Sequence, residues 1–127
     1  MKLLVVEDSK PIAKVISQIA ESLNYQVTLA TTLAEVETIL QGDTEFFAAT
    51  IDYSLPDAPD GEAIGCVLSH GIPSVVITGK MDEDTRQKIL SQQVIDYIPK
   101  ENSQAFLYLK RILHWQLINQ NNGILVV

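Results

Sequence analysis

Five polar residues in this sequence have the chemistry to bind a phosphoryl group beside a metal ion. Glu7, Asp8 and Asp52 are acidic and lie at the ends of short apolar runs. Crowded carboxylates take up protons unless a cation compensates them, and carboxylate oxygens suit Mg²⁺, which commonly completes its shell with phosphate. Thr78 offers a hydroxyl and Lys100 a compact positive charge for the phosphoryl oxygens. If these five residues converge, they predict a metal-assisted phosphoryl site.

Five apolar runs of strand length alternate with five segments of helical pattern. The strands are expected at residues 2–6, 26–30, 46–52, 73–77 and 94–98, and the helices at 9–24, 32–42, 62–69, 82–92 and 103–120. Such alternation produces a parallel sheet through right-handed crossovers, which predicts a doubly wound α/β domain. In these sheets the ligand site lies outside the carboxyl ends of the strands, where the five polar residues occur.

Local signals mark where several of these helices begin and which side they bury. Ser9 is expected to cap the first helix, with Pro11 in its first turn. Thr32 and Glu35 match a capping box at the start of the second helix. The last helix is expected to bury a side made of Phe106, Leu107, Leu109, Ile112, Leu113, Leu117 and Ile118.

The composition excludes several classes of protein. With 127 residues, 46% of them hydrophobic and 20% charged, the chain fits one globular domain. A formal net charge of -7 argues against direct nucleic-acid binding, which depends on Lys and Arg. Cys66 is the single cysteine and cannot form an intrachain disulfide, and no apolar run reaches the roughly 18 residues of a membrane span. A cytoplasmic protein without membrane contact is expected.

Four motifs fall at the expected strand ends. They are Val5-Val6-Glu7-Asp8-Ser9, Asp52 followed four residues later by Pro56, Thr78-Gly79, and Tyr97-Ile98-Pro99-Lys100. In this order they resemble the receiver domains of two-component response regulators, and the resemblance covers nearly the whole chain. It implies a receiver domain over residues 1–120. It also implies a flavodoxin-like, five-stranded parallel sheet in the order 2-1-3-4-5.

The resemblance implies phosphoryl transfer to Asp52. This carboxylate would attack the phosphorus of a phosphohistidine on a sensor histidine kinase or a phosphotransfer protein. Thr78 and Lys100 would be the other catalytic residues. The domain would catalyse only its own phosphorylation and dephosphorylation, and is not expected to be an enzyme in the usual sense.

The resemblance also implies a Mg²⁺ site and a conformational switch. Asp8 and Asp52, Glu7 largely through water, and the backbone carbonyl of Ser54 would hold the metal.

Thr78 and Tyr97 resemble the switch pair of the family, in which a hydroxyl turns toward the phosphoryl group and an aromatic ring follows it inward. The outer face of this switch comprises the fourth helix, fifth strand and fifth helix. That face could also form a homodimer.

Two features depart from the family pattern. The loop from Asp52 to Gly61 is one residue longer than usual and rich in proline and acid. Glu101 follows Lys100 where the family usually has a proline, often in a cis peptide bond. For a non-proline residue the cis form costs about 2.5 to 4 kcal/mol, so the orientation of Lys100 is left open.

The last residues suggest that the chain is part of a longer protein. Residues 121–127 read as a linker in which Ile124-Leu125-Val126-Val127 echoes the first strand, Leu3-Leu4-Val5-Val6. A second receiver is expected to begin there, and an output domain such as a diguanylate cyclase could follow it.

Three other functions stay open at this point. The chain could be a receiver-like docking module that never carries phosphate. A flavodoxin-type flavin mononucleotide binder would share the sheet, although Glu7 and Asp8 would repel its phosphate. An aspartyl phosphatase is disfavoured because Ser54, not a second aspartate, lies two residues after Asp52.

Overall fold

The sheet of this protein is parallel throughout. The computed structural model describes residues 1–79, 82–100 and 104–121. Its strands are β1 (Lys2–Val6), β2 (Gln26–Ala30), β3 (Ala48–Asp52), β4 (Ser74–Thr78) and β5 (Asp96–Pro99), and its helices are α1 (Lys10–Ser22), α2 (Leu33–Gly42), α3 (Glu62–Leu68), α4 (Glu83–Leu90) and α5 (Ala105–Asn121). The strand order is β2-β1-β3-β4-β5, so the predicted doubly wound, flavodoxin-like α/β fold is confirmed.

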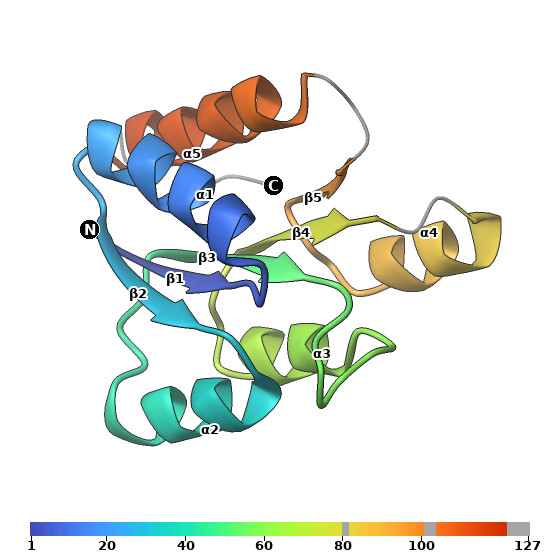
Figure 1. Cartoon of the computed structure of the whole chain (residues 1–127). Helices are drawn as coiled ribbons and strands as arrows, with labels where there is room; N and C mark the ends of the chain where they lie inside the picture. The colour runs from blue at the N-terminus through green and yellow to red at the C-terminus, as the bar shows by residue number, and fades with distance from the viewer. Residues whose placement is uncertain (80–81, 101–103, 122–127) are drawn as a thin grey trace.

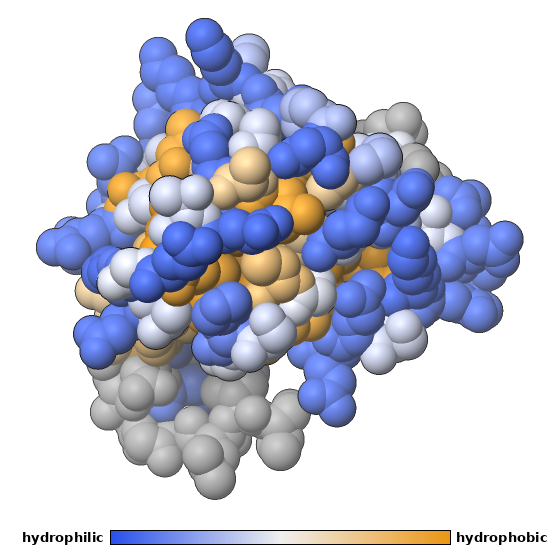
Figure 2. Space-filling model, turned by 90° about the horizontal axis from the view of Figure 1, so that it is seen from below, coloured by the Kyte–Doolittle hydropathy of each residue, from blue (hydrophilic) through white to orange (hydrophobic). Residues whose placement is uncertain are grey.

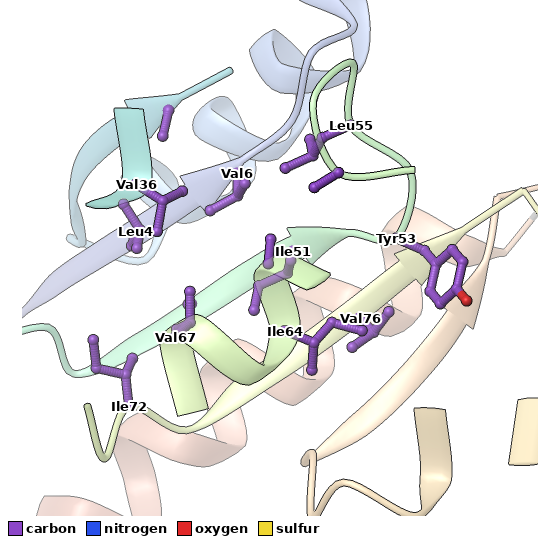
Figure 3. Packing of buried hydrophobic residues seen from close by; sticks show 14 of the residues in the cluster. Leu4, Val6, Val36, Ile51, Tyr53, Leu55, Ile64, Val67, Ile72 and Val76 are labelled. Atoms are coloured by element: carbon purple, nitrogen blue, oxygen red, sulfur yellow. The ribbon is translucent and has the colours of Figure 1, made fainter. Parts of the chain in front are cut away.

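Two hydrophobic cores lie on opposite faces of the sheet. Helices α1 and α5 cover one face, α2 and α3 cover the other, and α4 lies beside the edge formed by β4 and β5 (Figure 1). Successive strand residues point to opposite faces. Leu3 and Val5 therefore enter the core under α1 and α5, whereas Leu4 and Val6 enter the core under α2 and α3. Figure 3 shows this second core.

Two strands begin two residues later than expected. β3 begins at Ala48 instead of Phe46, because the ladder with β1 begins at Ala48, although Phe46 is already buried in the core. β5 begins at Asp96 instead of Val94. Gln93 has a φ of 51°, and this left-handed residue turns the chain from α4 toward the strand, which delays the extended conformation.

The first two helices begin differently. Ser9 occupies the position before α1, but its side chain makes no capping hydrogen bond within the described residues, so that prediction is wrong. Pro11 lies in the first turn, as expected, and removes one of the amide groups that a cap would serve. At α2 the prediction is confirmed for Thr32, whose hydroxyl accepts a hydrogen bond from the Glu35 amide at 3.1 Å. The Glu35 carboxylate, which a capping box directs to the Thr32 amide, instead accepts from the Thr31 amide at 3.3 Å.

α5 is less buried than its sequence suggests. Leu107 and Ile118 are 49% and 44% exposed, and Tyr108 and Trp115 on the same helix are also exposed. The helix carries more apolar residues than the stripe that faces the sheet can accommodate. Of the eight exposed large hydrophobic residues in the described ranges, four therefore lie on α5 and none on α2 or α3. On the face that carries α2 and α3, hydrophilic side chains dominate and apolar groups show between them (Figure 2).

The ends of the described chain add two facts. α5 continues to Asn121, one residue beyond its expected end, and the predicted linker and second-receiver segment over residues 122–127 lies outside the described residues. No helix within the described ranges is long and apolar enough to cross a membrane.

Candidate functional site

The carboxyl ends of four strands bring the predicted site residues to one edge of the sheet. Glu7 comes directly after β1, and Asp52 is the last residue of β3. Thr78 ends β4 and pairs with Pro99 of β5, which places Lys100 one residue beyond that pair. The Lys100 amide donates to the Thr78 carbonyl at 2.7 Å. Parallel register therefore brings together residues that are up to 93 positions apart in the chain.

Three carboxylates form the centre of this site. Glu7, Asp8 and Asp52 each place a carboxylate oxygen within 4.8 Å of the others. Glu7 is 1% exposed and Asp52 4% exposed, whereas Asp8 is open to solvent. The Ser9 amide donates to Glu7 Oε2 at 3.2 Å, and the Ser54 amide donates to Asp52 Oδ1 at 3.3 Å. The two buried carboxylates are thus held by the chain that follows each of them.

Lys100 supplies a positive charge between the two buried carboxylates. Its Nζ lies 3.1 Å from Asp52 Oδ2 and 3.2 Å from Glu7 Oε1. The contact with Glu7 Oε1 has the distance of an ion pair but not the geometry of a hydrogen bond, and this buried oxygen accepts no hydrogen bond from the described residues. One ammonium group therefore contacts two buried carboxylates, and Glu7 Oε1 is only partly satisfied.

The electrostatics of the site favour an additional cation. Burial, together with the adjacent Glu7, raises the pKa of Asp52 to about 6 against the opposing effect of Lys100. Burial opposes protonation of Lys100, but the charges of Asp52 and Glu7 outweigh it and raise the Lys100 pKa. Three carboxylates facing one ammonium, with an under-satisfied Glu7 oxygen among them, fit a small divalent cation with oxygen ligands. These residues therefore fit Mg²⁺.

The predicted switch residues lie on neighbouring strands. Thr78 is 1% exposed at the end of β4. Tyr97 on β5 is partly buried and packs against the core under α2 and α3. Its hydroxyl accepts a hydrogen bond at 3.0 Å from Nε of Arg86, an exposed residue of α4. Sequence analysis did not identify Arg86, because only the packing of α4 beside β5 brings the two residues together.

The loop after Asp52, defined here as the β3–α3 loop (residues 53–61), is extensively hydrogen-bonded. Leu55 and Ala58 are buried and exchange backbone hydrogen bonds at 3.0 and 3.1 Å. The Asp57 carboxylate accepts hydrogen bonds from the Leu33 and Ala34 amides of α2.

On the other side of the loop, Lys88 of α4 donates to the Asp60 carbonyl at 2.8 Å. The additional acidic and proline residues noted in the sequence therefore belong to an ordered loop held between two helices. The peptide bond between Lys100 and Glu101, the other departure from the family pattern, lies outside the described residues.

A hollow of about 760 Å³ lies away from the carboxylates. It is lined in part by Ile72, Pro73, Val94 and Trp115, near the amino ends of β4 and β5. None of its lining residues is ionisable at neutral pH. The acidic edge, and not this hollow, therefore carries the groups able to do chemistry.

Comparisons with known proteins agree with this fold. The sequence profile of the response regulator receiver domain matches residues 3–110. The structure of a probable two-component system response regulator/GGDEF domain protein is 34% identical, with a TM-score of 0.80, over 94% of this chain and 48% of that one. The present chain therefore spans about half the length of that protein. No curated protein sequence matches the chain.

Two isolated receiver domains have the same fold. A CheY-like response regulator receiver domain protein from Methanospirillum hungatei JF-1 is 25% identical, with a TM-score of 0.75, over 93% of this chain and 97% of its own. The non-phosphorylated HemR receiver domain from Leptospira biflexa is 20% identical, with a TM-score of 0.75, over 88% and 93% of the two chains. The likeness to HemR concerns the fold alone.

Proposed function

The chain belongs to the response regulator receiver domain family of two-component systems, and we propose that it accepts a phosphoryl group on Asp52. The observation that carries this proposal is the contact between Lys100 Nζ and Asp52 Oδ2 at 3.1 Å, next to two further carboxylates. A buried aspartate that only stabilised the fold would not need two acidic neighbours, because nearby negative charges destabilise its ionised form. The donor would be a phosphohistidine on a sensor histidine kinase or on a phosphotransfer protein.

The reaction transfers one phosphoryl group between two side chains. A carboxylate oxygen of Asp52 attacks the phosphorus of the phosphohistidine, and a new O–P bond forms as the P–N bond breaks. The electron pair of that bond stays on the imidazole of the donor. Lys100 already lies beside Oδ2 and compensates the negative charge that arrives. Thr78, at the end of the adjacent strand, would donate its hydroxyl to a phosphoryl oxygen.

The acidic residues would hold Mg²⁺ during this transfer. Asp8 and Asp52 would be direct ligands together with the Ser54 carbonyl, and Glu7 would bind largely through water. When bound, the metal neutralises charge on the transferring phosphoryl group and helps to align it. The exposure of Asp8 supports its role as a direct ligand, because this carboxylate is accessible from solvent.

The phosphorylated state would be transmitted through Thr78 and Tyr97. In the present conformation Tyr97 is held by Arg86, which ties β5 to α4. Movement of the ring toward an engaged Thr78 would break that bond and alter the face formed by α4, β5 and α5. The exposed Leu107, Tyr108 and Trp115 of α5 suit this face to a partner or to a second copy of the chain.

Acetyl phosphate with Mg²⁺ provides a direct test. Intact-mass spectrometry of the wild-type protein should show the addition of one phosphoryl group, and Asp52→Asn should show none. Asp84→Asn, at an exposed residue of α4, removes the same charge and should be phosphorylated like the wild type. An unmodified wild-type protein would favour the alternative of a docking module that carries no phosphate. An undiminished adduct in Asp52→Asn would place the phosphoryl group on another residue and contradict the role of Asp52.

The proposal extends to a longer protein of which the present chain would be one part. We propose that residues 1–120 form a receiver domain in a cytoplasmic protein with a second receiver or an output domain. The similarity to a response regulator/GGDEF domain protein supports a cyclic-dinucleotide-synthesising output. Sequencing the complete reading frame tests this directly, since a frame without either domain contradicts it.

A further inference from the structure

The N-terminus of α2 is capped by two residues from different parts of the chain. The first turn of a helix has amide groups without partners inside the helix. In α2 the Glu35 amide bonds to Thr32, the residue that local sequence signals predict. The Leu33 and Ala34 amides instead donate to the two carboxylate oxygens of Asp57, at 2.8 and 3.0 Å. A residue of the β3–α3 loop, 24 positions after Leu33, therefore completes this cap.

The hydrogen bonds between Asp57 and α2 hold the β3–α3 loop in place as well as capping the helix. Asp57 lies in the chain between Leu55 and Ala58, and both of these residues are buried in the core under α2 and α3. Ser54 Oγ donates to the Pro59 carbonyl at 3.1 Å, which closes the loop around Asp57. The segment from Ser54 to Pro59 thus has buried anchors, an internal hydrogen bond and one charged attachment to α2.

We propose that Asp57 is a positioning residue for metal binding, because its attachment to α2 holds the segment whose Ser54 carbonyl would contact Mg²⁺. This inference rests on the proposed function. Asp57 itself would not touch the metal or the phosphoryl group. It acts through residues 55 and 54, and the Ser54 amide in turn binds Asp52 Oδ1.

The charge of Asp57 suits this role. The hydrogen bonds from the Leu33 and Ala34 amides lower the pKa of the Asp57 carboxyl group, so the group stays ionised at neutral pH. Ionised acceptors make the stronger hydrogen bonds, and a negative charge is favourable at the positive end of a helix. Neighbours that orient a metal ligand commonly change metal affinity although they do not contact the metal.

Titration with MgCl₂, followed by ¹H–¹⁵N NMR of the amides of Asp8 and Ser54, tests the proposal without any phosphoryl donor. Asp57→Ala removes both acceptors, and we expect it to weaken Mg²⁺ binding by about tenfold, the lower end of the range for such neighbours. Asp57→Asn keeps one acceptor oxygen, and its affinity should lie between those of Asp57→Ala and the wild type. Glu37→Gln removes an exposed charge from α2 and should bind Mg²⁺ as the wild type does.

Each outcome separates the inference from the function on which it rests. If the wild type shows no saturable shift, the metal site and this inference both fail. If the wild type binds, Asp8→Asn does not, and both Asp57 variants match the wild type, only the inference is overturned. Equal weakening in Glu37→Gln would assign the effect to net charge and also overturn it. A graded loss confined to the Asp57 variants, in folded proteins with dispersed spectra, supports it.

Discussion

Two connections adjoin the acidic residues of the site, and they are built differently. The connection from β1 to α1 consists of Glu7, Asp8 and Ser9, and its serine makes no side-chain cap within the described residues. The β3–α3 loop has nine residues, 53–61, and is tied to α2 through Asp57 and to α4 through Lys88. The short connection contains the carboxylates of Glu7 and Asp8. The long loop follows Asp52 and connects it to α2 and α4.

The two connections differ in how much movement they allow near the site. A three-residue connection between two buried elements is constrained by its length alone. A nine-residue loop has more conformational freedom and needs specific contacts to be ordered. The contacts observed around Asp52 therefore indicate that the site depends on the geometry of the β3–α3 loop more than on that of the β1–α1 connection.

The largest effect is expected where the long loop is most crowded. Gly61 has a φ of 82°, and an added Cβ would lie 2.6 Å from Cε2 of the buried Tyr53 ring. Gly61→Ala should lower the free energy of unfolding by about 2 to 3 kcal/mol, because it combines backbone strain with a steric clash. Urea denaturation measures this loss. Gly42→Ala, where no atom lies within 4 Å of the added Cβ, is the control and should not destabilise the protein.

A smaller effect of opposite sign is expected at the nucleophile itself. Without metal, burial and Glu7 raise the pKa of Asp52 from 3.8 to about 6, so the ionised carboxylate destabilises the fold at pH 7. In the presence of EDTA, Asp52→Asn should raise the free energy of unfolding by about 1 to 2 kcal/mol at pH 7.

The pH dependence tests the cause of that gain. Because the folded-state pKa lies above the unfolded value, the folded protein binds the additional proton between about pH 6 and 4. Wild-type stability should therefore rise relative to the variant as pH falls through this window, and the difference should shrink. A difference that does not change with pH would contradict the assigned cause.

The smallest effects concern the two helix caps. Thr32→Ala should destabilise the protein by about 1 kcal/mol, because the Glu35 amide loses its partner. Ser9→Ala should change stability by less than about 0.3 kcal/mol, since the Ser9 side chain caps nothing in the described structure. Thermal or urea denaturation of the two variants compares them. Equal losses would contradict the finding that Thr32 caps its helix and Ser9 does not.

Much of this architecture follows from local patterns in the sequence. Apolar runs, helical periodicity and residues such as Thr32 and Pro11 depend on neighbours a few positions away, so they predicted every strand and helix and a parallel sheet. The strand order came from the family resemblance, and the structure agrees with it. The polar residues at the strand ends followed from the same reasoning, because parallel strands share one carboxyl edge. Their roles in phosphoryl transfer stay predictions.

The contacts that support the acidic site depend on packing between distant parts of the chain. The bonds from Asp57 to α2 and from Arg86 to Tyr97 join residues that no local period relates. The exposure of Leu107 on α5 also depends on which side of the helix the sheet can cover. These features arise from loop geometry and helix packing, which bring charges and hydrogen-bonding groups into contact only after the sheet has formed. The sequence therefore determined the residues at the site, and the fold determined what holds them.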